Sequence, residues 1–198
     1  MELLHFDKEI AVCIKPIGMD SEHEVPAILQ DILGGTFYTI HRLDKNVGGV
    51  MIYARTKDAA SKLTRAVQDG TFVKEYVAMV HGTPPEQGDW TNLLFKDSSK
   101  NKVFVVRRER KGVKRARLEF TRLTAGETSL VRVRLHTGRS HQIRVQFASR
   151  GYPLVGDSKY GGRDQVSSPM LFSCRLTVPA GKENRIFEAY PDWATSFL

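Results

Sequence analysis

The chain has 198 residues, of which 41% are hydrophobic and 26% are charged, a balance typical of a soluble globular protein and not of a collagen-like, disordered or membrane-embedded one. This length suits a single compact domain over residues 1–198. Thirty Lys and Arg against twenty-two Asp and Glu leave a formal charge of +8, which favours a polyanionic partner such as nucleic acid.

Strands dominate the elements predicted for the first half of the chain. The apolar stretch 9–15 predicts a strand, and a short helix is expected over 26–33. β-Branched and aromatic residues predict strands at 36–40 and 50–55, with a loop between them. Apolar residues at helical spacing predict the first clear helix, over 58–69.

The second half predicts one more helix, over 141–149, and otherwise strands. Gly and Pro residues predict a turn-rich crossing at 82–92, and 96–102 is expected to be a polar loop. Because strands predominate and the helices do not alternate regularly with them, the pattern indicates an α+β fold. The strands expected in this half are 72–81, 103–107, 115–122, 129–136, 170–178 and 185–190.

One of these strands, 129–136, carries a strong charge pattern. Three apolar residues alternate with Arg132, Arg134 and His136. Successive side chains of a strand point to opposite faces, so the pattern predicts one buried face and one basic face. We expect the basic face to contact a polyanion.

The loop 41–49, with the sequence HRLDKNVGG, places the carboxylate of Asp44 beside Arg42 and Lys45. A solvated loop with a surface Arg–Asp pair is the ordinary interpretation, since such pairs are common and weak. The functional interpretation is a carboxylate on a loop positioned by a rigid sheet, close to cations that keep it ionised.

Two further stretches have both an ordinary and a functional interpretation. In KEY, 74–76, the ring of Tyr76 is either a half-buried strand aromatic or a surface on which a nucleobase stacks. In HTGRSHQIR, 136–144, a turn leads into a helix start with two arginines, which favours phosphates, although a capped and solvated helix would explain it alone. His141 has no metal-type partner at i+4 and is interpreted as a hydrogen-bonding group.

Together these stretches resemble the RluA family of pseudouridine synthases. HRLD with Lys45 and Gly49, KEY, TGRSHQIR, and PLVGDSKYG at 153–161 occur in the order and spacing of that family. The resemblance extends from about residue 10 to the C-terminus. It implies the α+β pseudouridine synthase catalytic fold, with a mixed, mostly antiparallel sheet, a central cleft and few flanking helices.

The resemblance also implies roles for individual residues. Asp44 corresponds to the catalytic aspartate, and Tyr76 to the tyrosine that stacks on the target base, with a role in proton transfer left open. Arg144 corresponds to the basic residue that pairs with the aspartate, and Arg42 to an arginine that in some members fills the space of the displaced base. The expected RNA-binding residues are His41, Arg42, Lys45, Lys74, Arg132, Arg134, Arg139, His141 and Gln142.

The chain departs from the family pattern in two respects. Val47 and Gly48 replace the Thr and Ser of the usual HRLDxxTSG, which removes two hydroxyls near the catalytic loop. The S4-type RNA-binding domain found in several members is also not seen. We therefore expect the catalytic domain to supply its own RNA affinity.

The implied reaction is the isomerisation of specific uridines to pseudouridine in structured RNA, with ribosomal RNA favoured over tRNA. The N1–C1′ bond breaks and a C5–C1′ bond forms, either by carboxylate attack on C1′ or through a glycal, and the sequence does not distinguish the two. A paired base must be flipped out before it can react. The expected partners are RNA alone, with no metal or organic cofactor, no membrane and no protein partner, for a cytoplasmic monomer.

Two other functions remain open at this point. A non-catalytic RNA-binding module would keep the basic surface but need not keep Asp44, Tyr76 and Arg144 together. A nucleoside hydrolase normally uses two carboxylates that flank the bond, and only Asp44 lies in a motif. Analysis of the products separates the possibilities, because hydrolysis releases free uracil and isomerisation does not.

Overall fold

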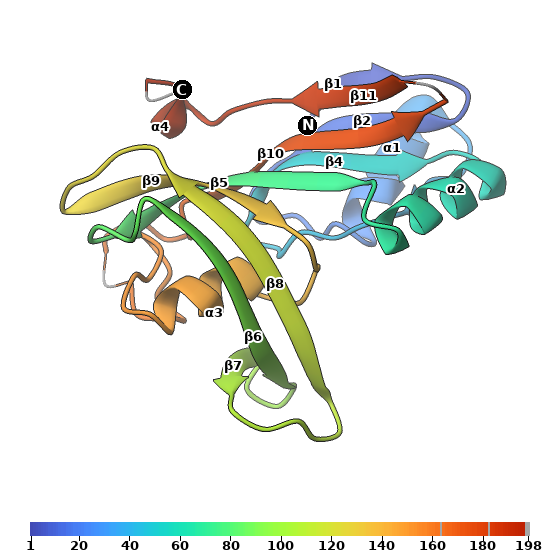
Figure 1. Ribbon diagram of the computed structural model, residues 1–198. Coiled ribbons are helices and arrows are strands. Elements are labelled where there is room, and N and C mark those ends of the chain that lie inside the picture. The colour runs from blue at the N-terminus through green and yellow to red at the C-terminus, as the bar shows by residue number, and fades with distance from the viewer. Residues whose placement is uncertain (163, 182, 197–198) are drawn as a thin grey trace. The chain divides into compact units, whose positions relative to one another are not determined.

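The computed structural model describes residues 1–162, 164–181 and 183–196 (Figure 1). The chain divides into two compact units: unit 1 comprises Met1–Glu75 and Phe172–Pro191, and unit 2 comprises Tyr76–Leu171 and Asp192–Leu198. Each unit is described by itself. No helix within the described residues is long and apolar enough to span a membrane.

Unit 1 contains a mixed sheet and two helices. In hydrogen-bonding order its strands run β1-β2-β4-β10, with β3 also paired to β4 and β11 to β10. The β4–β10 pair is parallel, and the other pairs are antiparallel. The elements are β1 (Glu2–Phe6), β2 (Ile10–Lys15), α1 (Glu24–Leu33), β3 (Tyr38–Thr39), β4 (Gly48–Ala54), α2 (Lys57–Gln68), β10 (Leu171–Ala180) and β11 (Glu183–Glu188).

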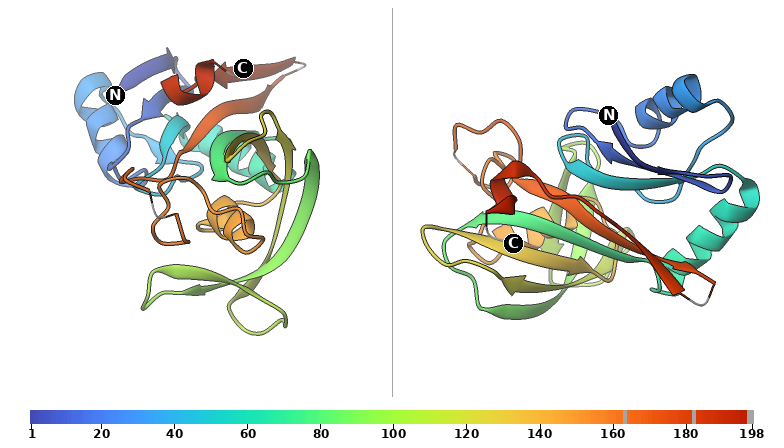
Figure 2. Two further views of the ribbon diagram at one scale, coloured as in Figure 1. Left: turned by 90° about the vertical axis from the view of Figure 1, so that its left-hand side faces the viewer. Right: turned by 90° about the horizontal axis from the view of Figure 1, so that it is seen from above.

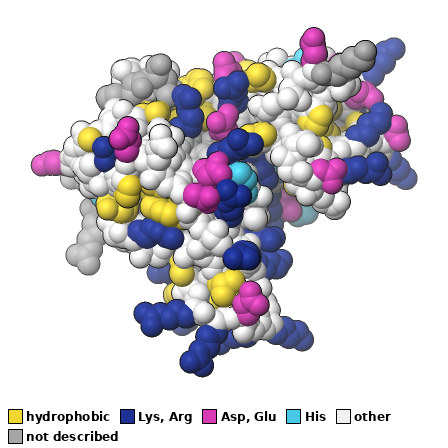
Figure 3. Space-filling model, viewed as in Figure 1, with side chains coloured by type: hydrophobic (Ala, Val, Ile, Leu, Met, Phe, Trp, Pro, Cys, Tyr) yellow, Lys and Arg dark blue, Asp and Glu magenta, His cyan; other side chains and the backbone are white. Residues whose placement is uncertain are grey.

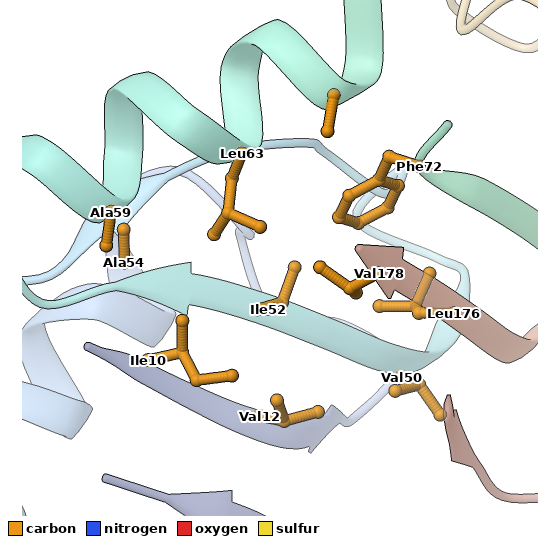
Figure 4. Packing of buried hydrophobic residues seen from close by; sticks show 11 residues of the cluster. Ile10, Val12, Val50, Ile52, Ala54, Ala59, Leu63, Phe72, Leu176 and Val178 are labelled. Atoms are coloured by element: carbon orange, nitrogen blue, oxygen red, sulfur yellow. The ribbon is translucent and has the colours of Figure 1, made fainter. Parts of the chain in front are cut away.

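The core of unit 1 forms where α2 packs on the sheet. The Thr56 Oγ1 atom accepts a hydrogen bond from the Ala59 backbone N–H and caps the start of α2. Figure 4 shows Leu63 of α2 and the nearby Phe72 ring lying against Ile52 of β4 and Val178 of β10. Every residue of β4 is buried, so this strand forms the centre of the unit.

Unit 2 contains strands in the order β5-β9-β8-β6-β7, together with α3. The pairs β9–β8, β8–β6 and β6–β7 are antiparallel. Figure 2 gives two further views of these strands. The strand β5 begins at the end of the first stretch of unit 1 and continues into unit 2. The elements are β5 (Val73–His81), β6 (Gln87–Asp97), β7 (Lys102–Val106), β8 (Val113–Arg122), β9 (Thr128–Leu135), α3 (Gln142–Ala148) and α4 (Asp192–Thr195).

An aromatic cluster holds α3 against β6 and β8. The rings of Trp90, Phe120 and Phe147 meet pairwise with centroids 4.4 to 5.1 Å apart. Gly88 makes room for this cluster, because a Cβ at that position would lie 2.2 Å from Phe120 Cε1. Gln146 adds hydrogen bonds from its Nε2 to the Trp90 carbonyl (3.1 Å) and to Asn92 Oδ1 (2.9 Å).

The mostly antiparallel strands and few helices confirm the α+β prediction. Two local predictions were wrong. The turn-rich crossing was expected to reach residue 92, but β6 already begins at Gln87, and the strand predicted at 36–40 reduces to Tyr38–Thr39. The single-domain organisation and the central cleft stay predictions.

Candidate active site

The Asp44 turn in unit 1 is held on both sides by buried residues. Ser21, 2% exposed, donates through Oγ to the Leu43 carbonyl (3.0 Å) and accepts from the Leu43 N–H (3.2 Å). The Val47 N–H donates to the Asp44 carbonyl (2.9 Å), and the Val47 side chain is buried. The backbone is therefore fixed on either side of Asp44, whose side chain is half-buried.

Two glycines follow this turn at the start of β4. A Cβ on Gly49, whose φ is +131°, would lie 2.4 Å from the Ser173 backbone nitrogen and 2.5 Å from its oxygen. Gly48 is not among the glycines with positive φ, but a Cβ there would lie 3.2 Å from the Lys15 carbonyl oxygen. The Gly49 position therefore excludes any side chain because β10 approaches it closely, whereas Gly48 could accept one only after a small shift.

Lys15 is a buried cation that the sequence analysis did not identify. Its Nζ donates to the carbonyls of Pro16 and Met19 (both 2.9 Å) and of Lys45 (3.3 Å). Burial lowers the pKa of Lys15 to about 8, while the negative charges of Asp20, Asp44 and Glu24 act to raise it. The ammonium thus joins the segment after β2 to the residue that follows Asp44.

Some of the predicted RNA-binding residues of unit 1 are exposed, and others are buried. Arg42 pairs with Glu22 (2.8 Å) and Lys45 with Glu24 (3.4 Å), and both cations are exposed. Arg42 is thus ion-paired with Glu22. Lys74 is 7% exposed, and burial lowers its pKa.

His41 is 8% exposed, and its ring centroid lies 5.5 Å from that of Phe72. The Ile52 N–H donates to its Nε2 (3.3 Å), and burial lowers the pKa of His41 to about 3. The ring is therefore neutral near pH 7 and supports β4. An RNA-binding role for His41, and likewise for Lys74, stays a prediction.

Tyr76 lies in β5 and is 5% exposed, so it is more buried than the half-buried aromatic expected from the sequence. The alternating strand is confirmed: Val131 and Val133 are buried, Arg132 is half-buried and Arg134 is exposed. Stacking of a base on Tyr76 stays a prediction.

Arg144 of α3 is held by a buried carboxylate of unit 2. Its Nε donates to Asp157 Oδ2 (2.7 Å) and its Nη2 to Asp157 Oδ1 (2.8 Å), with both side chains at most 3% exposed. The guanidinium carbon also lies 5.2 Å from the centre of the Tyr160 ring. Such a two-point pair fixes the plane of the guanidinium.

Tyr160 and Asp157 belong to the GDSKYG segment, and the sequence analysis assigned a role to neither. The Tyr160 hydroxyl accepts a hydrogen bond from the Val103 N–H (2.8 Å) and forms another with His141 Nδ1 (2.9 Å). The segment therefore orients both His141 and Arg144. The signal was the motif itself, but a motif does not show which of its side chains point inward.

The turn before α3 is organised by Gln142, which is 3% exposed. Its Oε1 accepts from Thr137 Oγ1 (2.8 Å) and from the Arg139 N–H (3.0 Å), and its Nε2 donates to the Arg117 carbonyl (3.0 Å). Arg139 is exposed. Gln142 therefore holds the turn, and an RNA-binding role for Arg139 and Gln142 stays a prediction.

Comparison with known proteins places these motifs in one family. Residues 9–149 match the family model described as RNA pseudouridylate synthase. The chain is 34% identical to an uncharacterized RNA pseudouridine synthase of Aquifex aeolicus, in an alignment of length 189 that covers 87% of this chain. It is 38% identical to the ribosomal large subunit pseudouridine synthase D of Vibrio cholerae, in an alignment of length 133 that covers 64% of this chain.

The chain spans 60% of the length of the Aquifex relative and 39% of the Vibrio relative. Among solved structures, the fold is similar to that of "Human RNA Pseudouridylate Synthase Domain Containing 1", with a TM-score of 0.83 at 22% identity, over 99% of this chain and 85% of that one. The RluA-type motifs, the family model and the relatives agree. The chain belongs to the RNA pseudouridylate synthase family.

Proposed function

We propose that this chain isomerises uridine to pseudouridine in structured RNA, with Asp44 as the essential catalytic residue. The observation that carries the proposal is the family match over residues 9–149, because it contains the HRLD, KEY and TGRSHQIR motifs together. The fixed backbone around Asp44 supports it, since a catalytic carboxylate must be positioned before the substrate arrives.

In the proposed reaction, Asp44 acts on the ribose of the target nucleotide, either by attack at C1′ or by removal of a sugar proton to form a glycal. Tyr76 retains the detached uracil, and Arg144 provides the positive charge that keeps Asp44 ionised. The support for the role of Arg144 is its orientation, which Asp157 and Tyr160 fix inside unit 2. A guanidinium that is already ordered loses little entropy when it binds a second anion.

We propose ribosomal RNA as the substrate class and tRNA as the second choice. The support is the Vibrio cholerae relative, whose name assigns it to the large ribosomal subunit. We also propose that the chain acts in the cytoplasm as a monomer, without a metal or organic cofactor.

The test uses RNA tritiated at uracil C5, incubated with the purified chain. Isomerisation releases tritium, because C5 loses its hydrogen when it forms the bond to C1′. It releases no free uracil. A non-catalytic RNA-binding module would release neither, and a nucleoside hydrolase would release free uracil. Mapping pseudouridine in RNA from cells with and without the gene then identifies the substrate.

A further inference from the structure

Almost all of the net positive charge of the chain lies in residues 96–115, here called the basic arm. The basic arm holds nine Lys and Arg against two acids, a surplus of seven out of the +8 of the whole chain. The other 178 residues carry 21 Lys and Arg and 20 Asp and Glu, so they are nearly neutral. The net charge that attracts a polyanion at long range is therefore concentrated in one short segment.

The basic arm is a projecting part of unit 2. The antiparallel pair β6–β8 extends to Phe95 opposite Val113, and β7 pairs with the outer half of β6. Figure 1 shows these strands running away from α3 and β9, and Figure 3 shows dark blue side chains gathered at their far end. Its exposed cations are Lys96, Lys100, Arg107, Arg108, Arg110, Lys111, Lys114 and Arg115.

Acidic side chains compensate few of these charges. Within the described part of the chain, the ion pair found among these cations is that of Lys100 with Asp97, with the Nζ–Oδ2 distance at 4.0 Å. Uncompensated Lys and Arg on a narrow projection produce a strong local potential, which attracts phosphates and accelerates association.

The base of the basic arm is packed against the segment that holds Arg144. Leu94, Val103 and Ala116 form a buried cluster with Val145 of α3. The Val103 N–H donates to the Tyr160 hydroxyl (2.8 Å), and the Tyr160 ring lies beside the Arg144 guanidinium. An RNA held by the arm would therefore be placed at a fixed distance from Arg144.

The composition of the basic arm fits the backbone of double-helical RNA better than single-stranded bases. Binding of single strands relies on open aromatic surfaces for stacking. Here Phe104, 37% exposed, is the only aromatic residue of the basic arm, and the neighbouring Phe95 ring is covered by the Arg110 guanidinium, 4.6 Å from the ring centre. Double-stranded RNA is recognised mostly through its phosphates and shape, which matches a surface of cations with few open rings.

We propose that the basic arm is the principal docking element of this chain for an RNA stem that flanks the target uridine. This proposal rests on the proposed function and specifies the RNA structure that the enzyme binds. The residues that react with the uridine lie outside the arm. Docking and chemistry are therefore separable by mutation.

The test compares two variants of the full chain that each lose four positive charges. The arm variant changes Arg107, Arg108, Lys111 and Lys114 to Gln, and leaves Arg110 on Phe95. The control variant changes Lys8, Lys57, Lys62 and Arg65, which are exposed residues of unit 1, to Gln. Thermal melts establish that both variants fold. The probes are a hairpin RNA and an unpaired RNA of equal length, titrated at several salt concentrations.

We expect the arm variant to bind the hairpin at least about tenfold more weakly at low salt. Its log–log salt slope should fall by roughly 0.9 for each phosphate that the arm no longer neutralises. In the control variant, the hairpin affinity and the salt slope should both stay much closer to wild type. The arm substitutions should weaken binding of the unpaired RNA less than binding of the hairpin. At saturating RNA, the single-turnover rate of the arm variant should stay within about twofold of wild type.

Equal losses in the two variants would show that only total charge matters and would overturn the proposal. An equal effect of the arm variant on hairpin and unpaired RNA would overturn the assignment to a stem. An arm variant with wild-type affinity for both RNAs, but weakened binding to anionic phospholipid vesicles, would point to a membrane surface instead. Binding is measured without turnover, so these outcomes remain distinct from a failure of the proposed activity.

Discussion

Asp44 illustrates how far a single functional residue depends on side chains that a motif does not contain. The HRLD motif includes Asp44, but the turn is held by Ser21 and by the buried ammonium of Lys15, from earlier segments. A lysine that precedes a proline is ordinarily expected at the surface, since buried lysines are rare. Only the three-dimensional structure shows that three carbonyls surround Lys15.

The pair of Arg144 and Asp157 gives a prediction about stability. Asp157→Ala removes the carboxylate that binds the buried Arg144 guanidinium at two points, so the free energy of unfolding should fall by about 3–5 kcal/mol. Asp89→Ala is the matched control, because it removes the carboxylate of an exposed pair with Arg117 and should cost much less. Urea unfolding measures both. Equal losses would contradict the assignment of Arg144–Asp157 as a buried ion pair.

The buried His41 predicts a specific acid sensitivity. Its pKa of about 3 in the folded protein lies below the ordinary value of 6.5, so between these values the unfolded chain binds more protons. Stability attributable to His41 is therefore full above about pH 6.5 and falls as the pH drops towards 3, by up to about 1.4 kcal/mol per pH unit.

His41→Gln keeps an acceptor for the Ile52 N–H and cannot ionise. We expect this variant to lose roughly 2–3 kcal/mol less than wild type between pH 6.5 and 4.5, by urea unfolding at each pH. His23→Gln, at an exposed histidine, is the control and should follow wild type. If all three proteins lose stability in parallel, His41 is not the buried neutral group described here.

At the scale of elements, most strands and helices were predictable, whereas their pairing was not. Periodicity locates α2 and the alternating strand β9, because local burial determines the pattern. The start of β6 was not found, because Gln87 and Gly88 are typical of a turn, while in the fold Gly88 makes room for the Phe120 ring. The parallel pairing of β4 with β10 joins distant segments and leaves no local signal.

That pairing makes Gly49 the most sensitive position of the loop. Gly49→Ala places a Cβ against the Ser173 backbone and also strains a φ of +131°, so it should cost at least about 1–3 kcal/mol. Gly48→Ala, one residue earlier, meets the Lys15 carbonyl at 3.2 Å and should cost less. Thermal unfolding with single-turnover rates measures the difference. A Gly49→Ala protein as stable as Gly48→Ala would contradict the close approach of β10.

At the scale of the whole molecule, charge is distributed very unevenly. The sequence predicts RNA affinity from a net charge of +8 and assigns part of it to Arg132 and Arg134. The structure shows that Arg132 is half-buried, and residues 96–115, expected in part to be a polar loop, carry the surplus of cations on a projection. Composition predicts that such a surface exists, but only the strand pairing shows where the cations gather.

The essential role of Asp44 is the central claim, and one measurement tests it most directly. Single-turnover tritium release from C5-labelled RNA is compared for wild type, Asp44→Asn and Asp58→Asn, a control at an exposed carboxylate of α2. We predict that wild type and Asp58→Asn react at the same rate, while Asp44→Asn folds, binds the RNA with similar affinity and releases no tritium. Release by Asp44→Asn near the wild-type rate would contradict the account.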